Sequence, residues 1–316
     1  MKLSAVVTTH DVAPWIESVL RSIAGQQRPP DEIVLLDDAS SDDTLARVEA
    51  SRVPVRLLRE RFRNAARARN VAVSHCSGEW IAFLDGDDVW RPEHLAEALA
   101  MLDAGSDVAL LASYREYFEE AGRWGDKAPL PVRPGAGLDD RDLYRCYVGP
   151  NIGWPTSGLV VRRDRFLEVG GFDETQLRRH DADLFLRLAA GRTWAYQPRP
   201  TWVYRKREGG NISAHRAECA YYLLRSMLKL REHYRGPEME ARIRRQARLA
   251  QSAALLAGDG PLVQRVAGLG GEYLGLSRKA LSAVHRVAPR AVEGLWRFAR
   301  ASAARRATAQ ADAGAP

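Results

Sequence analysis

The chain has 316 residues, of which 46% are hydrophobic and 28% charged, a composition that fits a globular protein with one large or two smaller domains. No apolar run reaches the roughly 18 residues of a membrane-spanning helix, and the N-terminus reads as a first strand, not as a signal peptide. The cysteines Cys76, Cys146 and Cys219 lack metal-ligand spacing, so we expect a reduced, cytoplasmic protein without a membrane span.

The net charge of +7 is unevenly distributed along the chain. Residues 214–316 hold 18 Lys and Arg against 8 Asp and Glu, a net charge of +10, which leaves −3 for residues 1–213. We therefore expect a domain over 1–213 and a basic helical extension over 214–316, whose last residues, from about 304, are disordered. Basic extensions of this kind often meet anionic surfaces.

Apolar runs alternate with amphipathic segments over the first hundred residues. The runs predict buried strands over 3–7, 33–36, 53–58 and 80–84. The segments between them predict helices over 14–24, from the capping sequence at 40–43 to about residue 50, over 66–76, and from residue 92 onwards. This order predicts an α/β fold with a mainly parallel sheet flanked by helices.

Later in the chain the pattern is less regular. Residues 105–160 are rich in Gly, Pro and aromatic side chains and are expected to form irregular connections that carry binding groups. Further strands are expected over 159–162 and 201–204, and a helix over 181–190. After residue 213 the sequence predicts helices broken at Gly and Pro.

Polar clusters follow three of the predicted strands: residues 8–11 (TTHD), 37–38 (DD) and 85–88 (DGDD). In an open parallel sheet, ligands bind outside the carboxyl ends of the strands. Aspartates at strand ends also make ordinary turns and helix caps, and that alternative stays open for each cluster. Three clusters on one edge favour a binding site.

The ligand class follows from what the clusters contain. No Gly-x-Gly-x-x-Gly turn and no Gly-x-x-x-x-Gly-Lys-Ser/Thr loop is present, so a glycine cradle for phosphates is absent from the sequence. An acidic site suits phosphates only if a divalent cation lies between them, and Mg²⁺ and Mn²⁺ prefer oxygen ligands. The sequence therefore predicts a cation that joins carboxylates to a diphosphate, with Gly86 allowing a close backbone approach.

Three stretches carry a family resemblance: SAVVTTHDVAPWIESVLRSIAGQQRPPDEIVLLDDASSDDT, ARNVAVSHCSGEWIAFLDGDDVWRPEHL and VVRRDRFLEVGGFDE. Together they resemble the family 2 glycosyltransferases of the GT-A fold over about the first 215 residues. The resemblance implies an inverting, metal-dependent transfer of a sugar from a nucleotide-diphosphate sugar, foremost a UDP-sugar. The acceptor would be a hydroxyl of a polysaccharide or glycolipid precursor.

The resemblance also implies roles for individual residues. Asp181 matches the general base, and Asp85 and Asp87 match the Asp-x-Asp motif that holds Mn²⁺ or Mg²⁺, with Asp87 as the direct ligand. The expected nucleotide-sugar-binding residues are Thr8, His10, Asp38, Arg69, Asp85 and Gly86. A helix N-cap is the alternative role for Asp181.

Several positions depart from the family pattern. His10-Asp11 replaces the usual Tyr-Asn, and His180 stands where Glu is common. His180 is a candidate acceptor contact, with solvent-facing packing as its alternative. Arg207 stands where the family often has His, so Arg205 and Arg207 are candidate diphosphate contacts, with a solvated basic strand end as the alternative.

Aromatic residues in the irregular region could contact a sugar acceptor or belong to the core. Trp154 is the candidate acceptor contact, and Trp124, Tyr144 and Tyr147 lie in the same region.

Two questions stay open at this level. Residues 279–306 mix apolar and basic side chains, which fits a helix on an anionic membrane surface or a helical cap with a solvated basic face. Nucleic acid is a less favoured partner, because no recognised binding motif accompanies the charge. The departures at His10, Asp11 and His180 also allow a nucleotide-sugar-binding scaffold protein without transfer activity.

Overall fold

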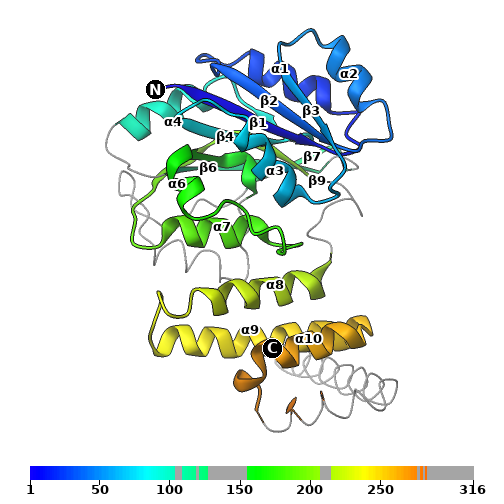
Figure 1. Ribbon diagram of the computed structural model, residues 1–316, viewed down its shortest axis with the longest axis vertical. Helices are drawn as coiled ribbons and strands as arrows, with labels where there is room; N and C mark the ends of the chain where they lie inside the picture. Colours follow the sequence, from blue (N-terminus) through cyan, green and yellow to red (C-terminus); the bar gives the residue numbers. More distant parts are fainter. Residues whose placement is uncertain are drawn as a thin grey trace, which may run out of the picture. The chain divides into compact units, whose positions relative to one another are not determined.

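The computed structural model describes residues 1–103, 109–118, 121–126, 155–206, 215–275, 278–279 and 282 (Figure 1). The chain divides into two compact units, Met1–Asn211 and Ile212–Pro316. The predicted boundary between residues 213 and 214 and the predicted disordered tail from about 304 both lie outside the described residues.

The first unit is built on a mixed sheet, which has nine strands among the described residues. Their order is β3-β2-β1-β4-β8-β6-β9-β5, with β7 paired to β6. The strands are β1 (Leu3–Thr9), β2 (Glu32–Asp38), β3 (Arg56–Glu60), β4 (Trp80–Asp85), β5 (Val89–Trp90), β6 (Ala109–Phe118), β7 (Arg123–Asp126), β8 (Leu159–Arg162) and β9 (Ala195–Lys206). The first four in this order pair in parallel, as predicted, and β8 then joins β4 antiparallel.

Helices cover the central strands. β1 buries nearly every residue, and a strand whose successive side chains are all buried must be covered on both faces. The helices of this unit are α1 (Ile16–Ala24), α2 (Thr44–Ala50), α3 (Ala65–Ser74), α4 (His94–Asp103), α6 (Arg163–Glu168) and α7 (His180–Ala189). α3 packs on β1 and β2, while α4 packs on β6 and β9. The predicted α/β fold with a sheet flanked by helices is confirmed.

Helix α1 shows how the pattern sets the local structure. Its apolar side chains at helical spacing, Ile16, Val19, Leu20 and Ile23, are all fully buried. The helix begins at Ile16 and not at Pro14, because residues 12–15 form a turn in which the N–H groups of Trp15 and Ile16 both donate to the Val12 carbonyl. Gly25 ends the helix, as predicted.

The region expected to be irregular contains regular structure that the sequence pattern did not predict. β6 and β7 form an antiparallel pair there, and β6 also pairs with β8 and with β9. β9 runs over Ala195–Lys206, three times the length of the predicted 201–204 strand. The long strand β6 is stabilised by partners far away in the chain, so its own sequence carries little sign of it.

The second unit is helical, as predicted. α8 (Arg216–Lys229), α9 (Pro237–Ala257) and α10 (Gly260–Gly270) are separated at Gly236 and Gly258, both of which have positive φ. α9 packs against α8 and α10. None of the helices in the described part of the chain combines the length and the apolar character needed to cross a membrane.

Candidate functional site

Strand register brings the three polar clusters to one edge of the sheet. Thr8 at the end of β1 lies opposite Asp85 at the end of β4, and Thr9 lies opposite Asp37 on β2. The Gly86 N–H donates to the Thr8 carbonyl (3.1 Å). A Cβ on Gly86 would lie only 2.9 Å from the Thr9 methyl group, so the turn after β4 needs glycine to pass this close to β1. The predicted sharing of one edge is confirmed.

Asp38 is almost fully buried, and its carboxylate contacts the backbone of residues 62–64. Its oxygens accept from the backbone N–H groups of Phe62 (2.5 Å), Arg63 (2.8 Å) and Asn64 (2.8 Å). Its carbonyl accepts from Nδ1 of His10 (2.7 Å), which fixes the ring proton on Nδ1. Asp38 therefore holds the loop before α3 and orients His10, and three of its roughly four acceptor positions are used.

Two further carboxylates of the acidic edge belong to turns. Asp11, in the left-handed region (φ 50°), accepts from the Ser41 N–H (2.6 Å), and this bond holds the pKa of Asp11 below its usual value. Asp37 accepts from the Thr9 hydroxyl (2.8 Å) and the Ser40 N–H (3.0 Å). The turn interpretation, left open for each cluster, holds for these two residues.

Arg69 links the acidic turn to helix α7. It lies inside α3, 5% exposed, and its Nη2 donates to Oδ1 of Asp85. Its Nη1 donates to Nε2 of His180 (2.8 Å). A guanidinium has no acceptor, so His180 must be neutral with its proton on Nδ1. Through these two bonds Arg69 joins the end of β4 to the start of α7.

His180 is buried, 8% exposed, with its ring edge against Phe172 (5.7 Å between centroids). The expected solvent-facing packing is wrong, because the side chain turns inward to Arg69. Burial, aided by Arg69 and Arg178, lowers the pKa of His180 to about 3. With one ring nitrogen bonded to Arg69, His180 is better placed to orient the start of α7 than to contact an acceptor.

Asp181 is the second residue of α7 and is half-buried. Its Oδ1 accepts from the Ala182 N–H (2.7 Å), while the N-cap position is taken by Arg179, so the N-cap alternative for Asp181 is wrong. Burial raises the pKa of Asp181, against the opposing effects of Arg179, the Ala182 N–H and Arg69. The Asp85 charge adds to the rise, so the two carboxylates lie within electrostatic range.

Asp88 is a buried member of the site that the sequence did not single out. Its carboxylate accepts from the Ser157 hydroxyl (2.5 Å) and from the Arg205 N–H (3.1 Å). Burial raises the pKa of Asp88 well above its usual value, and Asp87 and Asp85 raise it further. It was visible as the third acid of the DGDD cluster, but nothing in the sequence identified Ser157 as its partner.

Tyr114 on β6 was also missed. It is buried, and burial raises its pKa, with Glu116, Tyr204, Asp88 and Asp181 adding to the rise. The ring lies against Trp202 (4.7 Å between centroids). Tyr114 therefore lies within electrostatic range of both Asp88 and Asp181, and no local motif could have indicated this.

Arg205 and Trp124 are the remaining predicted residues within the described part of the chain. Arg205 donates through Nη2 to the Ser18 hydroxyl (3.0 Å), while its Nη1 is buried and has no hydrogen-bond partner among the described residues. Trp124 is 50% exposed and packs against Tyr117 (5.0 Å between centroids). The predicted residues that lie outside the described part of the chain are Trp154, Arg207, Tyr144 and Tyr147.

The acidic turn offers oxygen donors for a cation. Among the described residues, no group of three or more His, Cys, Asp and Glu side chains is arranged to hold a metal ion alone. Asp85 and the half-buried Asp87 offer two carboxylates, and Mg²⁺ in nucleotide sites typically uses one or two carboxylates plus phosphate oxygens. The donor set fits a cation shared with a phosphate ligand.

Comparisons with known proteins give a consistent picture. A family model described as "Glycosyl transferase family 2" matches residues 4–162, just over half of the chain. The succinoglycan biosynthesis protein ExoO of Rhizobium meliloti is 31% identical over 219 residues, covering 65% of this chain and 60% of that protein. An uncharacterized glycosyltransferase of Haemophilus influenzae is 25% identical over 187 residues, 59% of this chain and 61% of that protein. The chain thus spans about three fifths of these relatives' lengths.

Solved structures share the fold. Staphylococcus aureus TarS 1-349 in complex with UDP-GlcNAc matches with a TM-score of 0.64 at 20% identity, over 95% of this chain and 92% of that one. The mannosyltransferase PcManGT from Pyrobaculum calidifontis, in complex with GDP-Man and Mn²⁺, matches with a TM-score of 0.56 at 22% identity, over 93% and 82%.

Replacing Asp38 by Ala should destabilise the protein by about 3 kcal/mol, because several backbone N–H groups lose a charged acceptor. Urea denaturation measures the loss. The matched control is Asp43→Ala, since Asp43 is exposed and makes no cap hydrogen bond; its effect should stay within about 0.5 kcal/mol. Equal stability of the two variants would contradict the role of the Asp38 carboxylate.

The buried His180 should make stability fall in acid. Its folded pKa lies below its unfolded value of about 6.5, so the free energy of unfolding decreases as the pH drops from about 6.5 towards 3. His180→Gln keeps an acceptor for Arg69 and removes the titration. Between pH 7 and pH 5 the unmodified protein should lose about 2 kcal/mol more than this variant in urea denaturation. Parallel losses would show that His180 titrates normally.

Proposed function

Because the chain belongs to glycosyl transferase family 2, we propose that it is an inverting glycosyltransferase with a nucleotide-diphosphate sugar, foremost a UDP-sugar, as donor. The single observation that carries the proposal is the bridge through Arg69. This bridge ties the acidic turn at Asp85 to the start of α7. Asp181 therefore lies within electrostatic range of Asp85.

Asp181 is the proposed general base. In an inverting transfer the acceptor hydroxyl attacks the anomeric carbon while the nucleoside diphosphate leaves from the opposite face, and a base takes the hydroxyl proton. A carboxylate with a raised pKa binds that proton more strongly than an ordinary one. Arg179, the Ala182 N–H and Arg69 favour the ionised form of Asp181, because all three oppose the rise in its pKa.

Asp87 and Asp85 are the residues that would hold Mn²⁺ or Mg²⁺. When bound, the cation neutralises charge that develops on the departing diphosphate. The Mn²⁺ in the PcManGT complex, a protein of the same fold, supports this choice. Arg69 limits how strongly the turn repels the donor, since its guanidinium already neutralises one carboxylate.

Donor binding is proposed for the edge of β1 and β2. Thr8, His10 and Gly86 line that edge, and Asp38 acts mainly by fixing the His10 ring and the loop before α3. The Nη1 of Arg205, which has no partner in the described part of the chain, suits a diphosphate oxygen, and Arg207 is proposed for the same contact. Trp154 remains the proposed acceptor contact.

The acceptor is proposed to be a polysaccharide or glycolipid precursor. The named relatives support this class: ExoO is a succinoglycan biosynthesis protein, and RfbC of Myxococcus xanthus, 30% identical over 68% of this chain and 16% of that protein, is an O-antigen biosynthesis protein. We place the activity in the cytoplasm at the inner face of the membrane, with residues 214–316 meeting an anionic surface.

Asp181→Asn should lower the rate of transfer by about 10²- to 10⁴-fold and leave donor affinity unchanged, because the amide cannot accept the proton. Release of the nucleoside diphosphate with a UDP-sugar donor and a lipid-linked acceptor measures the rate. Asp164→Asn, an exposed carboxylate on α6, is the control and should keep full activity. Persistent transfer by the Asp181 variant would remove its role as base.

Asp87→Ala should abolish the Mn²⁺-dependent part of UDP binding, because the cation loses a ligand that links it to the chain. Isothermal calorimetry with UDP, with and without Mn²⁺, measures this. Binding that is insensitive to Mn²⁺ in both proteins would refute the proposed cation site. Tight UDP binding by the unmodified protein without any turnover would instead favour a nucleotide-sugar-binding scaffold.

A further inference from the structure

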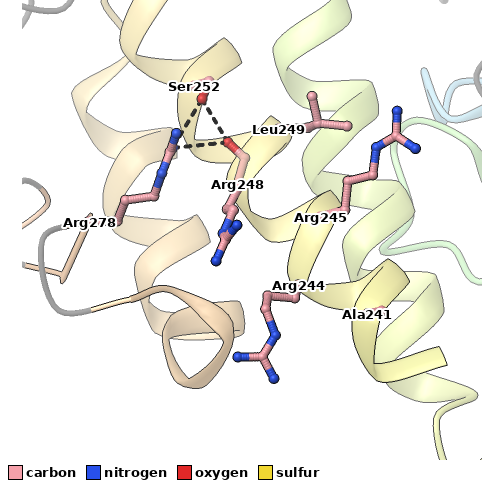
Figure 2. Close-up of a pocket in the computed structure, with 7 residues that line it drawn as sticks. All are labelled: Ala241, Arg244, Arg245, Arg248, Leu249, Ser252 and Arg278. Carbon is pink, nitrogen blue, oxygen red and sulfur yellow. Dashed lines mark hydrogen bonds between the residues drawn. The ribbon is translucent and has the colours of Figure 1, made fainter. Parts of the chain in front are cut away.

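A groove of about 310 Å³ lies on helix α9 in the second unit (Figure 2). Its α9 side is one helical face, with lining residues at spacings of three and four: Ala241, Arg244, Arg245, Arg248, Leu249 and Ser252. Arg278 closes the groove from a segment later in the chain. The opposite face of α9 is buried against α8 and α10. The arginine face is therefore the exposed face of this helix.

Three of the four arginines that line this groove lack a counter-charge among the described residues. Arg244, Arg245 and Arg248 are exposed, and their guanidinium groups form no ion pair within the described part of the chain. Other arginines of the second unit do: Arg242 pairs with Glu238 (2.8 Å) and Arg231 with Glu272 (2.7 Å). No carboxylate is among the described residues that line the groove. This face of α9 therefore gathers positive charges without a described carboxylate beside them.

Arg278 is held in place at the groove wall. Its Nη1 donates to Oε1 of Gln251 (3.0 Å), to the Ser252 hydroxyl (3.1 Å) and to the Arg248 carbonyl (3.3 Å), as Figure 2 shows in part. Burial and the nearby Arg248 charge lower its pKa. A guanidinium kept beside other cations in a partly buried place is stabilised when an anion enters.

The guanidinium groups and the apolar side chains that line the groove together favour one class of anion. Guanidinium groups bind phosphate through paired N–H···O bonds, which makes a phosphate ester the best-matched anion. Leu249 is 50% exposed between the arginines, and Ala241 adds a further apolar patch. Cations interleaved with apolar side chains on one helix face fit a membrane interface better than a purely aqueous anion.

We propose that this groove is a phosphate-ester site that takes the headgroup of an anionic phospholipid. The inference deepens the proposed membrane association of residues 214–316 and rests on it, but not on glycosyl transfer. Arg244 and Arg248 contact the phosphate, Arg278 borders it, and Leu249 faces the apolar part of the lipid.

The test is sedimentation of the full chain with phosphatidylglycerol–phosphatidylcholine vesicles, compared with pure phosphatidylcholine vesicles. The double variant Arg244→Gln/Arg248→Gln should bind the anionic vesicles roughly 10- to 30-fold more weakly, since each basic residue near the surface contributes about one factor of 5. The matched control Arg242→Gln also removes a positive charge from α9, but from outside the groove, and should change binding less than about 2-fold after its ion pair is lost. Unchanged circular dichroism would show that the exposed substitutions leave the fold intact.

The outcomes separate the proposals. If the unmodified protein binds anionic vesicles and the groove variant binds equally well, membrane association stands and the groove site is overturned. If no vesicle binds the unmodified protein, both are overturned, and the transferase proposal is untouched. If glycerol phosphate binds the groove while vesicles do not, or if only an oligonucleotide binds, the lipid is overturned as the ligand. Competition of glycerol phosphate with vesicle binding would support the phosphate chemistry.

Discussion

The buried guanidinium of Arg69 holds the candidate site together. Arg69 is 5% exposed, cannot give up its proton and therefore requires acceptors inside the protein. It finds one charged acceptor in Asp85 and one neutral acceptor in His180. Removing either partner would leave a buried charge partly uncompensated, which is costly. The turn after β4 and the start of α7 are for this reason fixed in one arrangement, and Asp181 is carried with them.

The concentration of acids at one sheet edge is tolerated because the carboxylates are divided between two tasks. Asp11, Asp37 and Asp38 are satisfied by N–H and hydroxyl donors of neighbouring turns, so their charge stabilises loops. Asp88 is buried, and its raised pKa reduces the repulsion within the DGDD cluster. Asp87, together with the Asp85 carboxylate that Arg69 contacts through Oδ1, remains the pair proposed for a cation and its phosphate ligand.

In the second unit, the charges that need partners are positive, not negative. Each of its helices buries one apolar face, and several of its arginines have carboxylate or tyrosine partners: Arg231, Arg235, Arg242 and Arg265. Arg244 and Arg248 on α9 have no such partner among the described residues, and gathered charge of one sign in a defined groove favours a ligand of the opposite sign, as the gathered acids do.

The sequence by itself determined the alternation of strands and helices in the first hundred residues and the placement of three polar clusters at strand ends, because local hydrophobic period and turn residues encode both. It located α7 to within one residue, and so the place of Asp181 at its start. Only the tertiary structure decided that β6 is a long strand, that Asp38 faces backbone N–H groups and that His180 is buried. These depend on partners distant in the chain, such as Arg69 for His180, 111 residues away, and no local pattern can specify a hydrogen bond whose two ends meet only after the sheet has formed.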